Sequence, residues 1–371
     1  MRPRGERRII VMAEGGFDLN EAKTAVGVMR YGRDTTLAVV DSTKAGMMAS
    51  EVVGTGTEVP IVGSVREALE RTKDANTLLL GTAPRGGGLP DAWRAQIREA
   101  MRAGLDVING LHAFLSDDPE LSAAARDASI DIWDVRRVPE THRVADTRAH
   151  TLPATVVLAI GSDCNVGKMS TMLEIDAIAR KRGRRSTFVP TGQTGILIAG
   201  WGVALDEVIS DFTAGAAEDL VMDAAREASS QGDLILVEGQ GSLVHPGYSG
   251  VTLSLVHGSA PDAMILCHQA GRTAIRRYTL PIPPLSRLIQ LYQGISEPVK
   301  PAKVIGISLN TFGMSEADAR AALDRASQET GLSATDPVRY GADTLLDAIE
   351  QFSARMPDKS AASNTTTKGA A

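Results

Sequence analysis

Residues Leu158–Thr171 read LAIGSDCNVGKMST, a short apolar run followed by a loop bounded by two glycines and then by Lys168. This order predicts a buried strand that turns into a helix, with backbone N–H groups and the positive end of the helix aimed at an anion. The glycines allow the tight path, and the ammonium of Lys168 can reach a phosphate. The residues expected to bind phosphate are Gly161, Ser162, Asp163, Cys164, Asn165, Val166, Gly167, Lys168, Met169 and Ser170. The alternative is a glycine-rich turn without a ligand.

The loop departs from the commonest phosphate-binding pattern in two ways. Five residues separate its glycines, and Met169 stands where a Ser or Thr usually follows the Lys and ligates Mg²⁺. This departure favours a loop that binds phosphate without cleaving it. Ser170 or Thr171 could still supply the hydroxyl after a small change of register.

The composition limits the classes of protein to which the chain can belong. Its 371 residues suit two domains, 43% of them are hydrophobic, and the net charge of −6 argues against a nucleic-acid-binding surface. No apolar run is long enough for a membrane span, and the short run that ends at Glu14 is unlike a signal peptide. Two cysteines, Cys164 and Cys267, cannot build a disulfide framework. We therefore expect a cytoplasmic protein without nucleic-acid or membrane partners.

Short β-type runs alternate with helical patterns along the whole chain, which predicts α/β domains with parallel sheets. We expect a Rossmann-like domain over 1–145, a second α/β domain over 150–356 and a disordered tail over 357–371. The expected strands are Thr36–Asp41, Ile61–Val62, Thr77–Leu80, Asp106–Asn109, Ile130–Val135, Thr155–Ile160, Ser186–Pro190, Leu234–Glu238, Ala263–Cys267 and Lys303–Leu309. The expected helices are Ser64–Arg71, Pro90–Gly104, Asp117–Ser129, Lys168–Arg182, Ala216–Ser230 and Ser315–Gly331.

The loop resembles that of dethiobiotin synthetase, a member of the P-loop NTPase superfamily, which also has five residues between its glycines and an Asp at the position of Asp163. Leu234–Leu243 (LILVEGQGSL) is similar to the Val-Glu-Gly turn of those enzymes, and Val304–Asn310 (VIGISLN) ends where they use an Asn to bind adenine. The resemblance implies a P-loop NTPase-like second domain, with Glu238 beside the loop and Asn310 on the cofactor. The alternatives are a carboxylate that caps the next turn and an ordinary turn Asn.

Motifs across roughly residues 10–350 resemble a narrower family, the bacterial D-glutamate N-acetyltransferases, which were formerly a domain of unknown function. The motifs are AVGVMRY (25–31), GTAPRGGGLP (81–90), NGLHAFLSDDP (109–119), PTGQTG (190–195), DFTAGAAE (211–218), VEGQGSLVHPGYSGV (237–251), CHQAGR (267–272) and LNTFG (309–313). The resemblance implies acetyl transfer from acetyl-CoA to the amine of D-glutamate or a related D-amino acid, by direct attack on the thioester.

That reaction requires a base for the amine and cations for the substrate carboxylates. Arg272 follows a strand end and a Gly, and its guanidinium suits bidentate carboxylate recognition. Asp211 and Glu238 are the acids expected near the substrate ammonium, and His245 and His268 are alternative bases.

Three further residues are expected to bind substrate: Gln193, Thr194 and Glu218. For Gln193 and Thr194, an ordinary strand–helix turn is the competing interpretation. Arg276 and Arg277 are further cations, for which a solvated face is the alternative, and Arg85 could meet a phosphate in its glycine-rich segment. We assign no metal site.

Two other functions remain open from the sequence. An ATP-dependent ligase or kinase of the dethiobiotin synthetase type would require Mg²⁺, and a nucleotide- or CoA-binding module would have no turnover. In the leading hypothesis the partners are an amino acid and acetyl-CoA, and a homo-oligomer is the general expectation for a soluble enzyme.

Overall fold

The structure is a computed structural model that describes residues 6–19, 21–56, 58–82, 88–139, 143–228, 230 and 232–357. Arg85 and the expected tail beyond residue 357 lie outside these ranges. The chain forms two compact units, residues 1–139 with 193–207, and residues 140–192 with 208–371. The segment 193–207 thus belongs with the first unit, although the domain prediction of 1–145 and 150–356 assigned it to the second. The domain limits themselves stay a prediction.

The first unit is a parallel sheet with the strand order β3-β2-β1-β4-β5-β6. Its strands are β1 Arg8–Met12, β2 Thr35–Val40, β3 Ile61–Val62, β4 Thr77–Leu80, β5 Asp106–Asn109 and β6 Ile132–Asp134. Its helices are α1 Lys23–Tyr31, α2 Ala49–Val53, α3 Val65–Arg71, α4 Asp91–Arg102, α5 Pro119–Ala128 and α7 Gln193–Ala199. The predicted Rossmann-like domain is confirmed.

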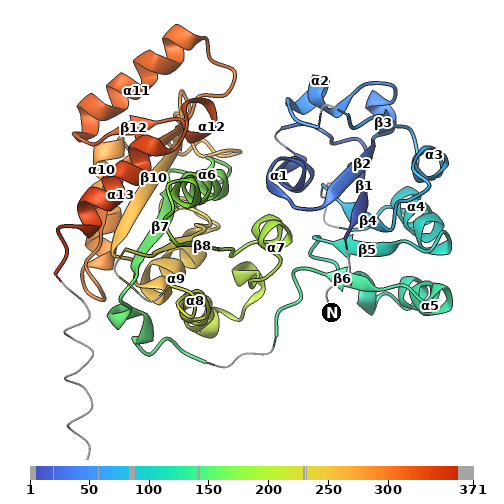
Figure 1. The fold of residues 1–371 in the computed structure, drawn as a ribbon, viewed down its shortest axis with the longest axis horizontal. Coiled ribbons are helices and arrows are strands. Elements are labelled where there is room, and N and C mark those ends of the chain that lie inside the picture. The colour runs from blue at the N-terminus through green and yellow to red at the C-terminus, as the bar shows by residue number, and fades with distance from the viewer. Residues whose placement is uncertain are drawn as a thin grey trace, which may run out of the picture. The chain divides into compact units, whose positions relative to one another are not determined.

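Both faces of this sheet are buried, which explains why its strands read as continuous apolar runs. Ile10 and Met12 of β1 pack with α3, α4 and α5, whereas Ile9 and Val11 pack with α1, α2 and α7. Figure 1 shows α1 on one side of the sheet and α3, α4 and α5 on the other. The strand β1 lies near the centre of the sheet, and the sequence analysis did not predict it.

The second unit is also a parallel sheet, with the strand order β12-β11-β10-β7-β9-β8. Its strands are β7 Thr155–Gly161, β8 Ser186–Val189, β9 Leu234–Val237, β10 Ala263–Gln269, β11 Lys303–Asn310 and β12 Ala334–Thr335. Its helices are α6 Lys168–Lys181, α8 Ser210–Ala224, α9 Ser249–Ser259, α10 Leu285–Ser296, α11 Glu316–Thr330, α12 Pro337–Tyr340 and α13 Asp343–Ser353. All seven residues of β7 are buried, and its neighbours are β10 and β9. The predicted P-loop α/β domain is confirmed.

One predicted helix is displaced. We expected Ala216–Ser230, but α8 spans Ser210–Ala224 and contains Gly215 in its interior. A Cβ at Gly215 would lie 1.9 Å from the carbonyl oxygen of Arg143, so this glycine is needed for close packing inside the helix. Because Gly usually weakens a helix interior, the local residue pattern gives no reason to expect a helix that continues through Gly215.

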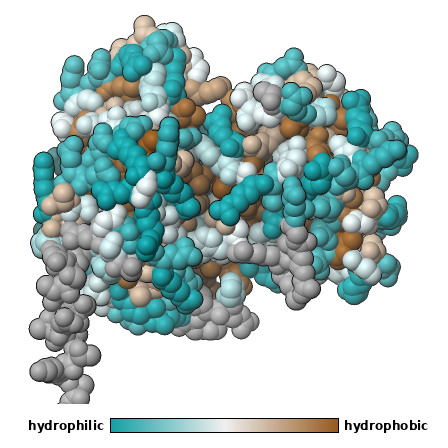
Figure 2. All heavy atoms as spheres, viewed as in Figure 1, coloured by the Kyte–Doolittle hydropathy of each residue, from teal (hydrophilic) through white to brown (hydrophobic). Residues whose placement is uncertain are grey.

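Apolar side chains form the buried cores, and the surface is mainly polar. Hydrophilic side chains predominate on the face of the molecule shown in Figure 2. Among the described residues, no helix has both the length and the apolar character that crossing a membrane requires.

Candidate active site

The phosphate loop lies where the carboxyl end of β7 meets the start of α6. Gly167 has a φ of 100°, and Asn165 has a φ of 52°, so both adopt left-handed backbone. The Nζ of Lys168 donates a 2.8 Å hydrogen bond to the carbonyl oxygen of Asp163, and the Lys168 side chain is buried. A Cβ at Gly161 would lie 2.8 Å from that Nζ. The loop therefore closes around a buried cation at the positive end of a helix, as an anion site requires.

Asp163 fastens this loop to the segment after β10. Its carboxylate is fully buried and accepts hydrogen bonds from the backbone N–H of Cys164 at 2.7 Å and of Arg276 at 2.8 Å. It also forms a 2.9 Å ion pair with Arg272. The side chain predicted to contact a cofactor thus acts on the loop's own conformation.

The expected role of Arg272 changes with this geometry. Besides Asp163, its guanidinium donates to the carbonyl oxygen of Cys164 at 2.8 Å, more weakly to that of Asn165, and to the side chain of Gln269. These bonds use the terminal N–H groups with which an Arg would hold a substrate carboxylate. Arg272 therefore braces the loop instead of presenting a fork to the substrate.

Tyr292 supports the phosphate loop, although it was not predicted from the sequence to do so. It lies on α10, and its fully buried hydroxyl donates to the carbonyl oxygen of Gly161 at 2.8 Å. The hydroxyl also accepts from the N–H of Leu243 at 3.2 Å. Burial raises the pKa of Tyr292 to about 12, so this bridge stays neutral over the physiological range. An isolated Tyr on an amphipathic helix gives no sequence signal for such a contact.

Glu238 follows β9 and caps the turn after β8. Its Oε2 accepts from the N–H of Thr191 at 3.0 Å and of Gly192 at 3.3 Å, and the Glu238 carbonyl accepts from the Thr191 hydroxyl. This is the turn-capping role that we weighed against catalysis. Glu238 nevertheless lies beside the loop, because a Cβ on the next residue, Gly239, would lie 3.0 Å from the Lys168 side chain.

We expect Gly239→Ala to destabilise the second unit. The added Cβ would lie 1.7 Å from the carbonyl oxygen of Ala159 in β7, so the backbone must shift. Such overpacking costs about 1–3 kcal/mol. Urea unfolding followed by circular dichroism should show the loss, whereas the control Gly250→Ala, which meets no atom within 4 Å, should not. Equal stability of the two variants would contradict the close approach of the Gly239 turn to β7.

His268 lies beside the phosphate loop, near the end of β10. Its Nδ1 is 2.8 Å from the hydroxyl oxygen of the buried loop residue Ser162. Burial, together with the positive charge of Arg272, lowers the pKa of His268 to about 4. A base this weak has little driving force for removing a proton from an ammonium, so His268 fits better as a neutral support of the loop.

The lowered pKa of His268 predicts a pH dependence of folding. The unfolded chain takes up a proton on this histidine near pH 6.5, whereas the native state takes it up only near pH 4. Stability from this group is therefore complete above pH 6.5 and decreases as the pH falls toward 4, by up to about 1.4 kcal/mol per pH unit. Urea unfolding at several pH values should show a smaller decrease in His268→Gln than in the parent or in the exposed control His112→Gln. If the free energy of unfolding depends on pH in the same way in the parent and in His268→Gln, His268 does not cause the pH dependence.

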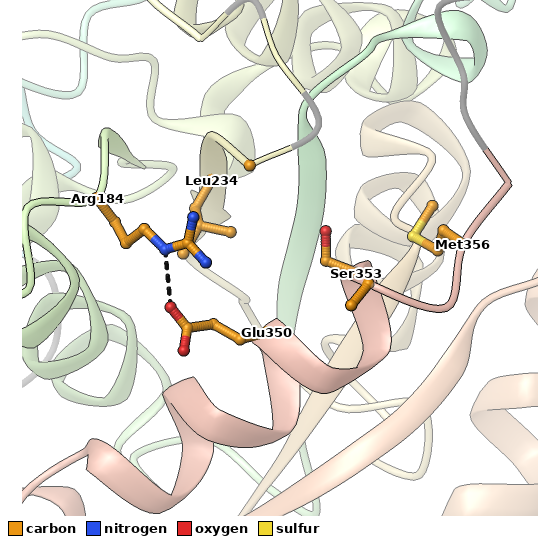
Figure 3. Close-up of a pocket in the computed structure, with 7 residues that line it drawn as sticks. Arg184, Leu234, Glu350, Ser353 and Met356 are labelled. Atoms are coloured by element: carbon orange, nitrogen blue, oxygen red, sulfur yellow. Dashed lines mark hydrogen bonds and ion pairs between the residues drawn. The ribbon is translucent and has the colours of Figure 1, made fainter.

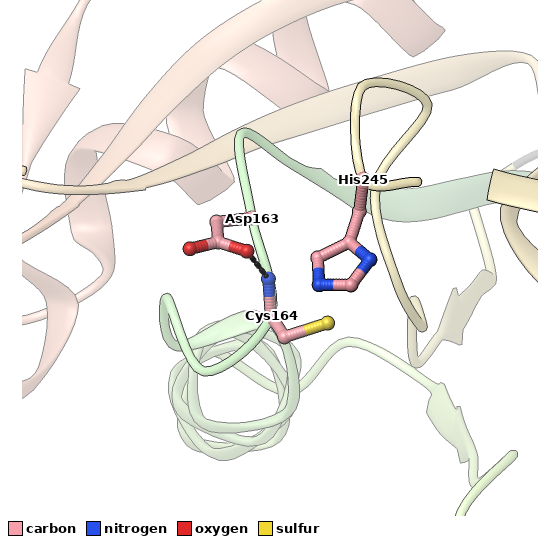
Figure 4. Close-up of side chains that lie close together, drawn as sticks. All are labelled: Asp163, Cys164 and His245. Atoms are coloured by element: carbon pink, nitrogen blue, oxygen red, sulfur yellow. Dashed lines mark hydrogen bonds between the residues drawn. The ribbon is translucent and has the colours of Figure 1, made fainter. Parts of the chain in front are cut away.

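His245 is also close to the loop. It is buried, its Nδ1 accepts from the N–H of Gly247 at 3.1 Å, and its ring contacts those of Tyr248 and Tyr278. A ring nitrogen, the Cys164 sulfur and an Asp163 carboxylate oxygen lie within 4.8 Å of one another (Figure 4). The geometry thus brings both predicted histidines, His245 and His268, to the loop.

The hydroxyls after Lys168 bear on the Mg²⁺ question. The Thr171 hydroxyl lies 2.9 Å from the carbonyl oxygen of Gly167 and 2.7 Å from the hydroxyl of Ser308. It is therefore engaged in the core, and Met169 is buried too. At the end of β11, the Asn310 side chain accepts from the N–H of Phe312 at 3.0 Å, which is the turn role considered as its alternative.

The structure gives the remaining candidates other contacts. The buried carboxylate of Glu218 pairs with Arg148 and accepts from the N–H of Asp146, so it fastens that segment to α8. Asp211 is exposed on the first turn of α8.

Gln193 and Thr194 form hydrogen bonds inside the first unit, Gln193 with Arg136 at 2.7 Å and Thr194 with Thr24 at 2.9 Å. These contacts account for both side chains without a ligand.

A pocket in the second unit lies far from this chemistry. It has a volume of about 350 Å³ and is lined by Arg184, Gly232, Leu234, Glu350, Ser353, Ala354 and Met356 (Figure 3). Leu234 is the first residue of β9, so the pocket opens at the amino ends of the strands. Ligands of open parallel sheets bind at the carboxyl ends, where the loop is, and we do not assign the pocket to the reaction.

The fold and loop define a P-loop α/β protein with an N-terminal Rossmann-like domain, and comparisons with known proteins agree. Residues 42–138 match the Rossmann-like domain of DUF1611_N, and residues 143–346 match the P-loop domain of DUF1611_C. The chain belongs to this family. A crystal structure of a DUF1611 family protein from Anabaena variabilis is similar, with 42% identity, a TM-score of 0.88, and coverage of 93% of this chain and 100% of that one.

Two relatives have names that state an activity. A protein of Tritonibacter scottomollicae is 39% identical over 338 residues, which cover 90% of this chain and 95% of the relative. One of a Pseudoalteromonas species is 38% identical over 274 residues, which cover 73% and 80%. Both are named D-glutamate N-acetyltransferase. This confirms the family resemblance seen in the sequence, and the chain is an N-acetyltransferase enzyme.

Proposed function

We propose that the protein transfers an acetyl group from acetyl-CoA to the amine of D-glutamate. The observation that carries this proposal is the match to two relatives of that name over most of the chain. In the reaction the deprotonated amine attacks the thioester carbonyl, a C–N bond forms, and the C–S bond breaks. CoA leaves as a thiolate, and the proton that the ammonium loses passes to a base and then to water.

The phosphate loop supports acetyl-CoA as the donor. The buried Lys168, the left-handed backbone at Gly167 and the positive end of α6 together form a site for a phosphate group of CoA. This binding holds the donor without any chemistry at phosphorus.

The same loop argues against the ATP-dependent alternative. A nucleotide-cleaving P-loop uses the hydroxyl after its Lys to ligate Mg²⁺. Here Met169 has none, and the Thr171 hydroxyl is bonded within the core. Of the hydroxyls after Lys168, that of the half-buried Ser170 remains a candidate Mg²⁺ ligand. An acetyltransferase needs no such ligand, because no phosphoryl group is transferred.

For the acceptor we propose residues next to the loop. The Arg276 main chain is bonded to Asp163, and the next residue, Arg277, has a strained φ of 68°. These two arginines are the cations that we propose for the carboxylates of D-glutamate. Glu238, at the carboxyl end of β9, is the proposed base, and the exposed Asp211 is its alternative.

A turnover assay tests the proposal. The protein is incubated with acetyl-CoA and a panel of D- and L-amino acids, and CoA thiol release is measured together with the acetylated product. We expect thiol release with D-glutamate above that with L-glutamate. Release of ADP from ATP with the same panel would support the ligase or kinase, and thermal stabilisation by CoA without any turnover would support a binding module.

A further inference from the structure

We propose that His245 is a neutral hydrogen-bond donor to a phosphate oxygen of the acetyl donor, and not the general base. The inference rests on the proposed function, in which the loop binds a phosphate group of acetyl-CoA. It gives the site a binding residue that lies outside the loop, in the segment between β9 and α9.

The position of the ring proton follows from one hydrogen bond. The N–H of Gly247 points at Nδ1 of His245 at 3.1 Å. A backbone amide can only donate, so Nδ1 must contribute its lone pair, and the neutral imidazole then carries its proton on Nε2. In this arrangement Nε2 has no lone pair with which to take a proton from an amine. The ring offers an N–H group at this nitrogen.

The surroundings of the ring direct that N–H group toward the loop. His245 is 4% exposed, and the rings of Tyr248 and Tyr278 pack against it at centroid distances of 4.6 and 5.3 Å. In Figure 4 the ring edge with the nitrogen farther from the backbone faces the Cys164 side chain. Nε2 forms no hydrogen bond with the part of the chain that the structure describes. Leaving a buried donor without a partner is costly, so the position suits an acceptor atom on a ligand.

The charges near the ring favour an anion over a metal ion. Asp163, Cys164 and His245 are residue types that can bind zinc, and they lie close together. However, the Asp163 carboxylate is already paired with Arg272 and accepts two backbone amides. A nitrogen that carries a proton cannot ligate a metal, and the nearby Lys168 repels one. A phosphate oxygen meets neither obstacle.

Three substitutions at His245 separate a donor from a base. The amide nitrogen of Gln reaches about as far as Nε2, whereas that of Asn reaches only about as far as Nδ1. We expect the Kd for CoA, measured by calorimetry on the whole protein, to change less than about threefold in His245→Gln. It should rise by about tenfold in His245→Asn and His245→Ala, the value of one hydrogen bond to a charged group.

Loss of kcat in all three variants with an unchanged Kd for CoA would overturn the inference in favour of a base. Lys168→Ala separates failure of the inference from failure of the proposed function. If Lys168→Ala weakens CoA binding and the His245 variants do not, only the inference fails. If neither Lys168→Ala nor the His245 variants weaken CoA binding, the loop is not the CoA site. That part of the proposed function then fails together with the inference.

Two measurements test the inference on the unaltered protein, so they do not depend on whether a variant folds. Nitrogen-15 spectra of histidine-labelled protein, with the His245 signal assigned, should show the tautomer protonated at Nε2, and protonation at Nδ1 would overturn the inference. Metal analysis of the purified protein should find no stoichiometric zinc. If the protein holds one zinc per chain, and a chelator both removes the zinc and changes the His245 signal, the cluster binds a metal instead.

Discussion

Replacing Lys168 by Ala should raise KM for acetyl-CoA by about 10–150-fold while lowering kcat far less. The buried ammonium lies in the loop proposed to bind a phosphate group of CoA, and a charge-assisted hydrogen bond is worth about 1.5–3 kcal/mol. The phosphates of CoA are remote from its thioester, so the contact contributes equally to the ground state and the transition state. Removal of such uniform binding appears in KM.

The measurement is a pair of steady-state titrations, one with acetyl-CoA varied and one with D-glutamate varied. Lys181→Ala, at the exposed opposite end of the same helix, is the matched control and should behave like the parent. An unchanged KM for acetyl-CoA in Lys168→Ala would remove the loop from donor binding and favour a different nucleotide there.

Replacing Arg272 by Ala should destabilise the second unit by about 3–5 kcal/mol. The substitution leaves the Asp163 carboxylate fully buried without its cation, and breaking a buried pair from one side costs this much. Arg272→Lys should recover only part of the loss, because an ammonium cannot reach Asp163, the Cys164 carbonyl and Gln269 together.

Urea unfolding of the single variants and of the double variant Asp163→Asn with Arg272→Ala tests this. The double variant should be more stable than Arg272→Ala, since it removes the stranded charge, and the exposed control Arg325→Ala should match the parent. If Arg272→Ala keeps full stability and raises only KM for D-glutamate, Arg272 binds the substrate carboxylate after all.

Much of the architecture could be predicted from local patterns. The Lys168 helix and the strands around it follow from hydrophobic runs and glycines that neighbouring residues alone determine. The same holds for β3, β4 and β5, whose bounds match the predicted ones. The strand β1 was missed because its apolar run near the N-terminus was weighed only against a signal peptide, and the helix α1 that follows it was not predicted either.

The candidate site divides in the same way. The loop was predictable because Gly161, Gly167 and Lys168 act within one short segment. The residues that contact this segment from elsewhere in the chain were not predictable. Arg272 and Tyr292 reach the loop from positions more than a hundred residues away in the chain, and each could equally have faced solvent or the core.

The sequence by itself therefore determined the two parallel-sheet domains, the loop and the family, since periodicity, glycine spacing and motifs are properties of the linear chain. Only the tertiary structure decided the roles of the charged and polar side chains. Glu238 caps a turn, Glu218 holds Arg148, and His245 turns its Nε2 edge toward the loop. The physical reason is that a side chain's role depends on which donors, acceptors and charges surround it, and folding brings those together from distant segments.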